Sequence, residues 1–449
     1  GSTTAALISA QNALSMSRVI QGNIFNDGGY GVYQSGVNTN QENQGTMIAD
    51  NEFNGQNSYI MYIAYDNSIV INDNTGNALS ANGIYLNYCN DEIQILRNRI
   101  YANNYGVYLS NCAGGDDLES DPGLIANNFV TVTSNYGFYL NNSSYHNYYY
   151  NSVNMTSGNT NTVGFYLYNG SSNNVVNNSF VHSGWGMAAE IYTPSAVADL
   201  NYNNYFSNGN YLAAWGTIDY YDFESFRTAS GKDANSVNVY PHYASSTDLH
   251  TMTPWLDGMG TPLSEVTQDI DGQARDGSAP DIGADEFTAD AGNTTPLAGH
   301  YTIGGSSPDY ATFDDAVADL LIKGVSDTVF MDFRNGNYQI HKVLYTFPGT
   351  AVDMPVIFQS ESGSRDDVTL YYYASDNNDN YVLYLHGADW LHFRNLGFSG
   401  NTGANNYSIN FMLSGGVNGF NLTDCALTGT TNGSTTAALI SAQNALSMS

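Results

Sequence analysis

Three aspartates at close spacing offer the first candidate chemistry. Asp269, Asp271 and Asp276 resemble the beginning of a calcium-binding loop, in which carboxylate oxygens are the ligands. The glutamate that ends such a loop is missing, because position 12 counted from Asp269 is Pro280. The three aspartates are a candidate calcium site, and the alternative is an acidic loop held by hydrogen bonds. We expect no other cofactor.

Two further groups of polar residues are candidates for a metal or catalytic site. The acidic loop 114–121 (GGDDLESD) interrupts the pattern of its surroundings and is a second candidate for calcium. A mixed cluster contains His386, Asp389, His392 and Arg394. Because apolar residues alternate with His392 and Arg394, we expect an exposed polar strand face there and no catalytic site.

The element that must position these residues is a short repeat, in which an Asn is followed two residues later by an apolar side chain. The repeat recurs about every 26 residues, a length typical of one solenoid coil. Parallel crossovers are right-handed in almost every known case, so the sequence predicts an all-β, right-handed parallel β-helix. Asn tolerates the left-handed corner of such a coil, and stacked amides hydrogen-bond along the axis. We therefore expect an architectural Asn column of Asn23, Asn51, Asn74, Asn98, Asn128, Asn151, Asn178 and Asn204, with Gly76 replacing the apolar residue after Asn74.

A second motif, of the type Gly-Val-Tyr-Leu, lies between these Asn positions and has the period-two alternation of a strand. Burying its phenols would require hydrogen-bond partners for each, so the apolar neighbours should face inward and the Tyr residues outward. The expected inward residues are Val32, Met61, Ile84, Val107, Phe138 and Phe165. The expected outward ladder is Tyr33, Tyr62, Tyr85, Tyr108, Tyr139 and Tyr166.

Two of the three cysteines share one register. Cys89 follows Gly83 by six residues and Cys112 follows Gly106 by six, which places the two cysteines one coil apart. Cα atoms stacked about 4.8 Å apart lie within the disulfide range. Both a bridge and a pair of reduced, packed thiols are open, and strand geometry favours the reduced pair. Cys425 has no partner in the pattern.

One helix is expected in the chain. Residues 312–324 (TFDDAVADLLIKG) have Thr312 as N-cap, Asp315 three residues later and a closing Gly324, with apolar residues at helical spacing. We expect this amphipathic helix to cap a first coil. The predicted organisation is coils over 1–287, a linker over 288–298, and a cap with further coils over 299–449.

The two ends of the sequence are identical. Residues 1–17 and 433–449 both read GSTTAALISAQNALSMS, at an offset of 432 residues. This identity predicts a tandem array whose natural unit starts at 299, runs to 432 and continues from 1 to 287. The alternative is a subunit whose ends overlap with those of the next copy, as in strand donation.

Composition excludes several classes of protein. The chain has 42 acidic and 11 basic residues and a net charge of −31, which excludes nucleic acid as a partner. Hydrophobic residues make up 42%, which excludes a disordered acidic tail. No apolar run reaches the length of a membrane span, so we expect no membrane insertion in this segment.

Three pairs of short motifs mark the two ends of the predicted unit. They are 299–305 (GHYTIGG) with 309–313 (DYATF), 269–275 (DIDGQAR) with 280–287 (PDIGADEF), and 221–226 (YDFESF) with 232–237 (KDANSV). In these stretches the chain resembles secreted bacterial right-handed parallel β-helix surface proteins with pectate-lyase-like coils. The resemblance implies an exported, cell-surface protein, and the 432-residue repeat favours a giant filament-like or adhesin-like member.

These features together predict a structural repeat unit of an extracellular filament, stalk or adhesin shaft, without catalysis. Its partners would be identical units end to end, and glycans are a further candidate ligand. The alternative is a carbohydrate-binding or carbohydrate-cleaving β-helix protein, since polysaccharide lyases and hydrolases share this solenoid. Such enzymes need a calcium cradle with a basic residue, or paired carboxylates. Arg97 and Arg99 are the best candidates for such a basic residue. We expect no pair of acidic residues beside them in the adjacent coils that match the Asn repeat.

Overall fold

The computed structural model describes all residues except 1–4, 13, 15–16, 79, 116–120, 375–379, 401–408, 430–437 and 443–449. The chain forms two compact units. Unit 1 contains residues 1–252 and 256–288, and unit 2 contains residues 253–255 and 289–449. The acidic loop 114–121 lies largely outside the described residues.

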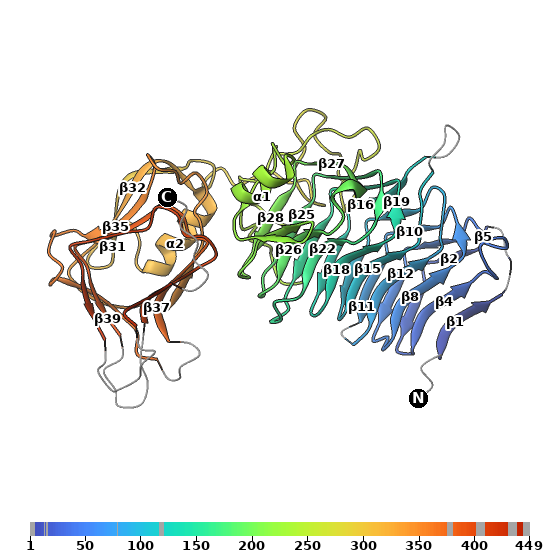
Figure 1. The fold of residues 1–449 in the computed structure, drawn as a ribbon, viewed down its shortest axis with the longest axis horizontal. Helices are drawn as coiled ribbons and strands as arrows, with labels where there is room; N and C mark the ends of the chain where they lie inside the picture. The colour runs from blue at the N-terminus through green and yellow to red at the C-terminus, as the bar shows by residue number, and fades with distance from the viewer. Residues whose placement is uncertain are drawn as a thin grey trace. The chain divides into compact units, whose positions relative to one another are not determined.

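Unit 1 is a stack of coils in which each coil contributes one strand to each of three sheets (Figure 1). The first sheet contains β1 (Ala6–Gln11), β4 (Tyr30–Ser35), β8 (Tyr59–Ala64), β12 (Asn82–Asn87), β15 (Tyr105–Ser110), β18 (Tyr136–Asn141), β22 (Val163–Leu167), β26 (Met187–Ile191), β29 (Ala213–Trp215) and β30 (Ile218–Tyr220). The second contains β2 (Val19–Gln21), β6 (Met47–Ala49), β10 (Val70–Asn72), β13 (Gln94–Leu96), β16 (Gly123–Ala126), β20 (His146–Tyr149), β24 (Asn173–Val176) and β27 (Val197–Asn201). The third contains β3 (Ile24–Asn26), β7 (Glu52–Asn54), β11 (Thr75–Ala78), β14 (Arg99–Ala102), β17 (Phe129–Val132), β21 (Ser152–Met155), β25 (Ser179–His182) and β28 (Asn204–Ser207).

Two short parallel pairs extend the corners of these coils. They are β5 (Asn43–Gln44) with β9 (Asp66–Asn67), and β19 (Ser143–Ser144) with β23 (Gly170–Ser171). A 3₁₀ turn, η1 (Pro194–Ala196), leads into β27.

The register of the first sheet confirms the predicted stacking. Val32 pairs with Met61, Ile84 with Val107, and Phe138 with Phe165, and all six side chains are buried. Successive coils are 23 to 31 residues long, close to the predicted average of 26. The fold is therefore the predicted right-handed parallel β-helix, with a core of stacked apolar rungs.

The last coil of unit 1 is closed by a helix and a hairpin. β30 pairs antiparallel with β29, which ends the parallel stacking. Helix α1 (Phe223–Ser230) then buries Phe226 against Tyr205, with ring centroids 5.5 Å apart.

After α1, residues 233–252 and 256–287 run back along the outside of the coils. We call this segment the return tail. It bonds to corner residues of successive coils, through contacts such as Val239–Asn204, Tyr150–Thr261 and Asn127–Gln268. The strands of the third sheet from β17 to β25 are consequently buried on both faces.

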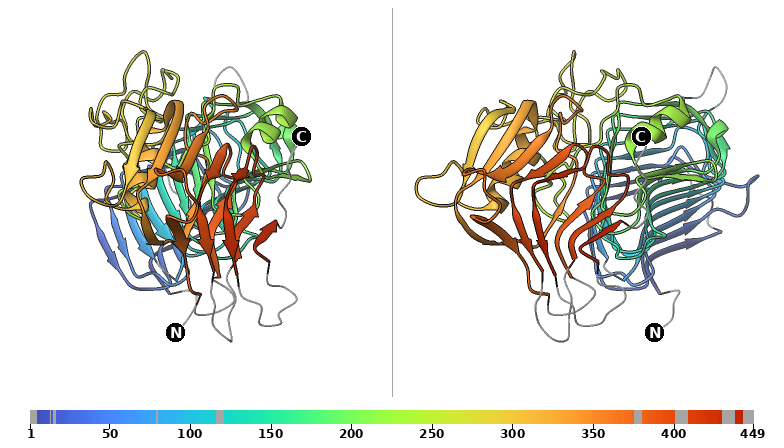
Figure 2. Two further views of the ribbon diagram at one scale, coloured as in Figure 1. Left: turned by 90° about the vertical axis from the view of Figure 1, so that its left-hand side faces the viewer. Right: turned by 60° about the vertical axis from the view of Figure 1, so that its left-hand side comes forward.

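Unit 2 has the same three-sheet plan with fewer coils, and Figure 2 shows its strands as parallel rungs. One sheet contains β31 (Leu297–Ile303), β32 (Val325–Phe333), β35 (Val356–Ser360), β38 (Leu391–Arg394) and β41 (Asn421–Thr423). The next contains β33 (Gly336–Gln339), β36 (Val368–Tyr371), β39 (Gly397–Ser399) and β42 (Ala426–Thr428). The last contains β34 (Lys342–Leu344), β37 (Tyr381–His386), β40 (Ile409–Ser414) and β43 (Ile440–Ala442).

The predicted helix is α2 (Phe313–Lys323), with Thr312 as N-cap. Thr312 and Asp315 form a reciprocal capping box, because the Thr312 side chain accepts from the Asp315 N–H and the Asp315 side chain accepts from the Thr312 N–H. The apolar face of α2 closes the first coil, with Phe313 packed on Phe333 and Phe358.

The unit boundary lies one residue from the predicted one, after Thr288 instead of Phe287. Two details differ from the prediction. β31 begins at Leu297, within the predicted linker. Residues 253–255 belong to unit 2, because the Trp255 indole N–H donates to the carbonyl of Ile322 in α2.

Candidate functional site

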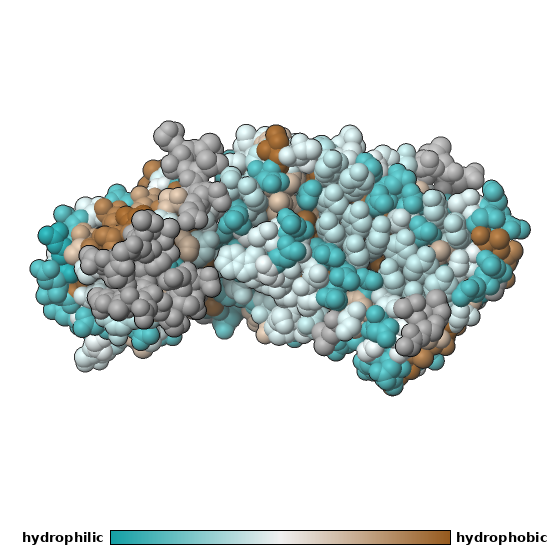
Figure 3. Space-filling view, turned by 60° about the horizontal axis from the view of Figure 1, so that its bottom comes forward, coloured by the Kyte–Doolittle hydropathy of each residue, from teal (hydrophilic) through white to brown (hydrophobic). Residues whose placement is uncertain are grey.

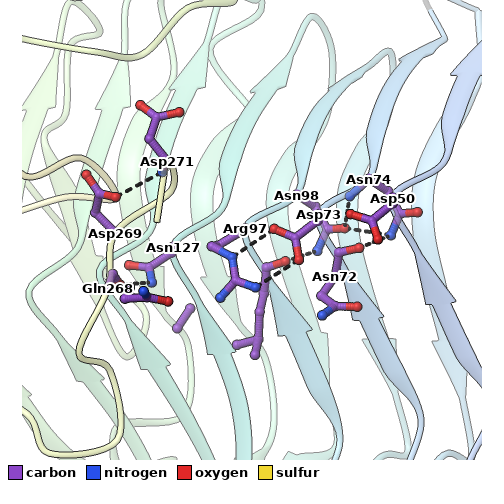
Figure 4. A network of polar contacts seen from close by, with 12 residues as sticks. Asp50, Asn72, Asp73, Asn74, Arg97, Asn98, Asn127, Gln268, Asp269 and Asp271 are labelled. Atoms are coloured by element: carbon purple, nitrogen blue, oxygen red, sulfur yellow. Dashed lines mark hydrogen bonds and ion pairs between the residues drawn. The ribbon is translucent and has the colours of Figure 1, made fainter. Parts of the chain in front are cut away.

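The most regular polar feature of unit 1 is a buried ladder of asparagine amides. In each coil, the Asn Oδ1 accepts hydrogen bonds from the backbone N–H and the side-chain amide of the Asn in the preceding coil, at 2.9 to 3.2 Å. The side-chain amide also donates to a backbone carbonyl of the coil behind it, as Asn98 does to Ile71. Figure 4 shows part of this ladder at Asn74 and Asn98. Its members are Asn23, Asn51, Asn74, Asn98, Asn128, Asn151, Asn178 and Asn203.

The last member differs from the predicted one. Asn203, not Asn204, accepts from Asn178, because the inward residue two positions later is Tyr205 and not Phe206. The ladder then ends on Ser236, whose Oγ accepts from the Asn203 N–H at 2.8 Å. Asn204 instead bonds Ser179 and the return tail.

The predicted left-handed conformation of the Asn residues is wrong. The left-handed residue at each corner is the one before the Asn, as at Asp73 (φ 58°), Arg97 (φ 51°) and Tyr150 (φ 52°). The Asn itself supplies hydrogen bonds that satisfy the carbonyls turned inward at the corner. Its function is therefore hydrogen bonding and not backbone tolerance.

The cysteines have the same function at another corner. Cys89 and Cys112 are free and buried, and each follows a left-handed residue. The Cys112 thiol donates to the carbonyls of Leu86 and Ser110, and the Cys89 thiol donates to Ile63 and Asn87. Burial raises the pKa of the Cys89 thiol. Both thiols are thus structural donors in the reduced form.

The predicted tyrosines form a column on the outer face of the first sheet. From Tyr33 to Tyr166, successive ring centroids are 4.6 to 5.2 Å apart. A partial second column beside it contains Tyr30, Tyr59, Tyr105 and Tyr136. The rings are half-buried, and burial together with neighbouring phenols raises the pKa of Tyr62 to about 12. The end pairs Tyr33–Tyr62 and Tyr139–Tyr166 are stacked face to face, whereas the three contacts between them are tilted by 45° to 58°.

The three aspartates of the candidate calcium site do not converge. Asp269 is buried, and its carboxylate accepts from the backbone N–H groups of Asp271, Gln273 and Glu286. Asp276 accepts from the N–H groups of a following turn. Asp271 instead makes an ion pair with Arg99 at 2.5 Å. Figure 4 shows Asp269 and Asp271 with their carboxylates apart.

A different group, which the sequence did not indicate, does converge. His250, Asp271 and Asp285 place possible ligand atoms within 4.8 Å of one another. However, His250 uses Nε2 for Asp271 at 2.8 Å and Nδ1 for Asp248. Burial lowers the pKa of His250, but these hydrogen bonds outweigh burial and raise it. Both ring nitrogens of His250 face carboxylates, so in this arrangement the group is a hydrogen-bond and ion-pair network that fastens the return tail.

Arg97 and Arg99 each bond one carboxylate, and the expectation that no acidic pair lies beside them stays a prediction. Arg97 bonds Asp73 of the adjacent coil through two nitrogens, each at 2.8 Å (Figure 4). Arg99 bonds Asp271 of the return tail. These interactions tie neighbouring coils to each other and the return tail to the coils.

A third arginine, Arg275, is buried at the centre of the return tail. Its guanidinium lies 3.9 Å from the Tyr150 ring centroid and bonds Glu286 at 3.1 Å and Asn127 at 2.8 Å. The predicted end motif is therefore a clamp between tail and coils. The adjoining cavity, of about 380 Å³, has Asp276, Asp281 and Glu286 in its wall.

The four residues of the mixed cluster in unit 2 lie in different environments. His392 and Arg394 are partly exposed on β38, as predicted, and Arg394 bonds Gln359. His386 is buried instead, with Nδ1 2.8 Å from the Ser414 hydroxyl, because it ends β37 at a corner. Asp389 accepts from the N–H of Asn418.

No protein-family model and no curated protein matches the chain. Among the residues that the structure describes, neither helix has the length and apolar character needed to cross a bilayer.

We predict that Asn98→Ala destabilises unit 1 by about 3 kcal/mol, because it removes a buried amide and leaves carbonyls and amides of two coils without partners. The measurement is urea unfolding of the 449-residue chain. Asn77→Ala is the matched control, since Asn77 is exposed on β11 of the same unit. Equal effects of the two substitutions would contradict a stabilising function of the ladder.

A second prediction concerns Asp233, which is buried beside Ser236 and Tyr205. Burial raises the pKa of Asp233 to about 7. When the pKa of a carboxyl is higher in the folded state than in the unfolded state, its contribution to the free energy of unfolding is fully present below the unfolded-state pKa. That contribution is lost as the pH rises through the folded-state pKa. The free energy of unfolding of Asp233→Asn, relative to wild type, should therefore increase by about 3 kcal/mol between pH 5 and pH 8. Asp91→Asn, at an exposed corner, is the control, and a difference that does not change with pH would contradict the assignment.

Proposed function

We propose that this chain is a structural repeat unit of an extracellular filament, stalk or adhesin shaft, without catalysis. The observation that supports the proposal is the direction of the contacts between coils. Strand pairing, the Asn ladder and the Tyr column all run along one axis, from coil to coil. Such a structure is quasi-one-dimensional, so repetition increases its length without altering its cross-section.

The duplicated ends support a tandem arrangement of units. An identical 17-residue segment at an offset of 432 residues fits an array whose partners are further copies of the same unit. Subunits that overlap through these ends are the alternative. Both arrangements produce a long solenoid.

The polar residues support a non-catalytic function. The candidate groups are engaged in corners, ion pairs and the tail clamp, as Arg97, Asp269 and Arg275 illustrate. Location outside the cell rests on the resemblance to secreted pectate-lyase-like β-helix surface proteins. The net charge of −31 would keep long assemblies apart in solution.

The first test is the mass of the denatured native polypeptide, with glycans accounted for. We expect a value several times 48.6 kDa, and filaments in electron micrographs of the intact material. A mass near one unit together with compact single particles would contradict the shaft.

Carbohydrate binding is the second candidate function, and one observation favours it. Ten tyrosines form a continuous outer face on the first sheet, with hydroxyls available to sugars. Since neighbouring rings of the main column are only 4.6 to 5.2 Å apart, no sugar fits between them, and the shaft proposal expects no measurable binding.

Calorimetric titration of the chain with acidic and neutral oligosaccharides tests this expectation. Tyr108→Ala would remove a central ring of the column, and Tyr373→Ala, at an exposed position in unit 2, is the control. Binding that is lost in the first variant and kept in the second would favour the carbohydrate-binding function over the plain shaft.

A further inference from the structure

We infer that β43 of one repeat copy and β1 of the next are one and the same strand, inside a single continuous solenoid. The inference rests on the proposed shaft and specifies where its units join. It follows from the edges of the two units, each considered by itself. The partner at each edge is a further copy of this chain.

The described part of the duplicated segment forms an edge strand in both units, with opposite sides paired. Among the described strands of unit 1 it is β1, which pairs with β4 alone, the strand that follows it in the coil order. Among those of unit 2 it is β43, which pairs with β40 alone, the strand that precedes it. The side that is open in one copy is thus the side that is occupied in the other.

The registers of the two edges agree. Ile440 pairs with the buried Phe411, and its equivalent Ile8 pairs with the buried Val32. Ser441 pairs with Met412, and its equivalent Ser9 pairs with Tyr33 of the outer column. A slip of one residue would turn the Ile outward, so the same face points to the core in both copies.

Strand order requires that the segment be used once. Chain order at the end of unit 2 is β41, β42, β43, and at the start of unit 1 it is β1, β2, β3, β4. Suppose that β43 and β1 are one strand. In the three sheets, β2 then stacks on β41, β3 stacks on β42, and β4 stacks on the shared strand, so each sheet gains one strand per coil. Two separate strands would add a rung to one sheet alone and break the stack.

The asparagine corner agrees with this joint. In unit 2, Cys425 follows the left-handed Asp424, and its thiol donates to the carbonyls of Phe393 and Thr423. These are the positions to which Asn98 donates in unit 1, on Ile71 and Leu96. Cys425 therefore occupies the ladder position one coil before Asn23.

Burial at the two open ends also points to a missing neighbour. The inward residues Leu422 and Leu427 of the last unit 2 coil are only half-buried, whereas Phe393 and Phe398 one coil earlier are buried. Large apolar side chains are exposed on the duplicated segment and the strands beside it, namely Leu7, Leu14, Val19 and Ile24 in unit 1 and Leu439 and Ile440 in unit 2. Figure 3 shows hydrophobic residues at the right-hand end, over the first strands of unit 1. The opposite ends of the two units are the ones closed by helices α1 and α2.

Thiol labelling with a maleimide of native polypeptide tests the joint. Cys425 is half-buried at the open end of unit 2, while Cys89 and Cys112 are buried and report that the coils are intact. In the 449-residue chain at high dilution, Cys425 should be labelled first. In native polypeptide that contains several repeat copies, Cys425 should be labelled roughly tenfold more slowly, because the first coil of the next copy, which contains Asn23, covers it.

A rearranged chain gives a second measurement. It runs from 289 to 449 and continues directly at Arg18 to 288, so that each residue of the unit is present once. We expect one cooperative thermal transition and protection of Cys425. Ile440→Ala should lower the melting temperature of the rearranged chain, in which this residue is buried, and leave the 449-residue chain unchanged, in which it is at an edge.

The outcomes separate the joint from the shaft. Labelling of Cys425 at equal rates in all three chains, or two transitions in the rearranged chain, would overturn the joint even if the native mass showed many units. Protection of Cys425 in the rearranged chain together with a single-unit native mass would uphold the joint and contradict the covalent shaft.

Discussion

The structure depends on how the chain turns corners without leaving buried peptide groups unsatisfied. Each coil must reverse direction within a few residues, and at the Asn corner the turn is made by one left-handed residue, such as Asp73 or Arg97. The next side chain donates to carbonyls of its own coil and the coil behind it. Asn does this at one corner, and Cys89, Cys112 and Ser143 do so at another. Since such hydrogen bonds cross from coil to coil, each corner also fixes the register of the next.

Much of the fold was predictable because it depends on local repetition. Period-two alternation identified the inward and outward residues of the first sheet, and the capping signal at Thr312 located α2 to within a residue. The Asn column was predicted except at its last member. There two neighbouring asparagines fit the pattern, and only the direction of Tyr205 distinguishes Asn203 from Asn204.

The contacts of the return tail were not predictable, since no local pattern encodes them. Arg99 meets Asp271 across 172 residues, and Arg275 meets Asn127 across 148. The sequence therefore indicated an acidic calcium loop at Asp269, Asp271 and Asp276, where the fold divides the three carboxylates among separate hydrogen-bond systems. The convergence of His250 with Asp271 and Asp285 likewise exists only after the tail has folded back.

The return tail also changes how unit 1 would respond to force. Backbone hydrogen bonds between coils lie along the stacking direction, so tension along that direction loads successive rungs in series, and the weakest rung sets the strength. The tail bonds corners from Arg99 to Asn204, with the buried Arg275 between them, and so carries load in parallel with those rungs. A break between two coils in this region must also strip the tail from its corners, so unit 1 should yield first near β1 to β11, where these tail contacts are not made.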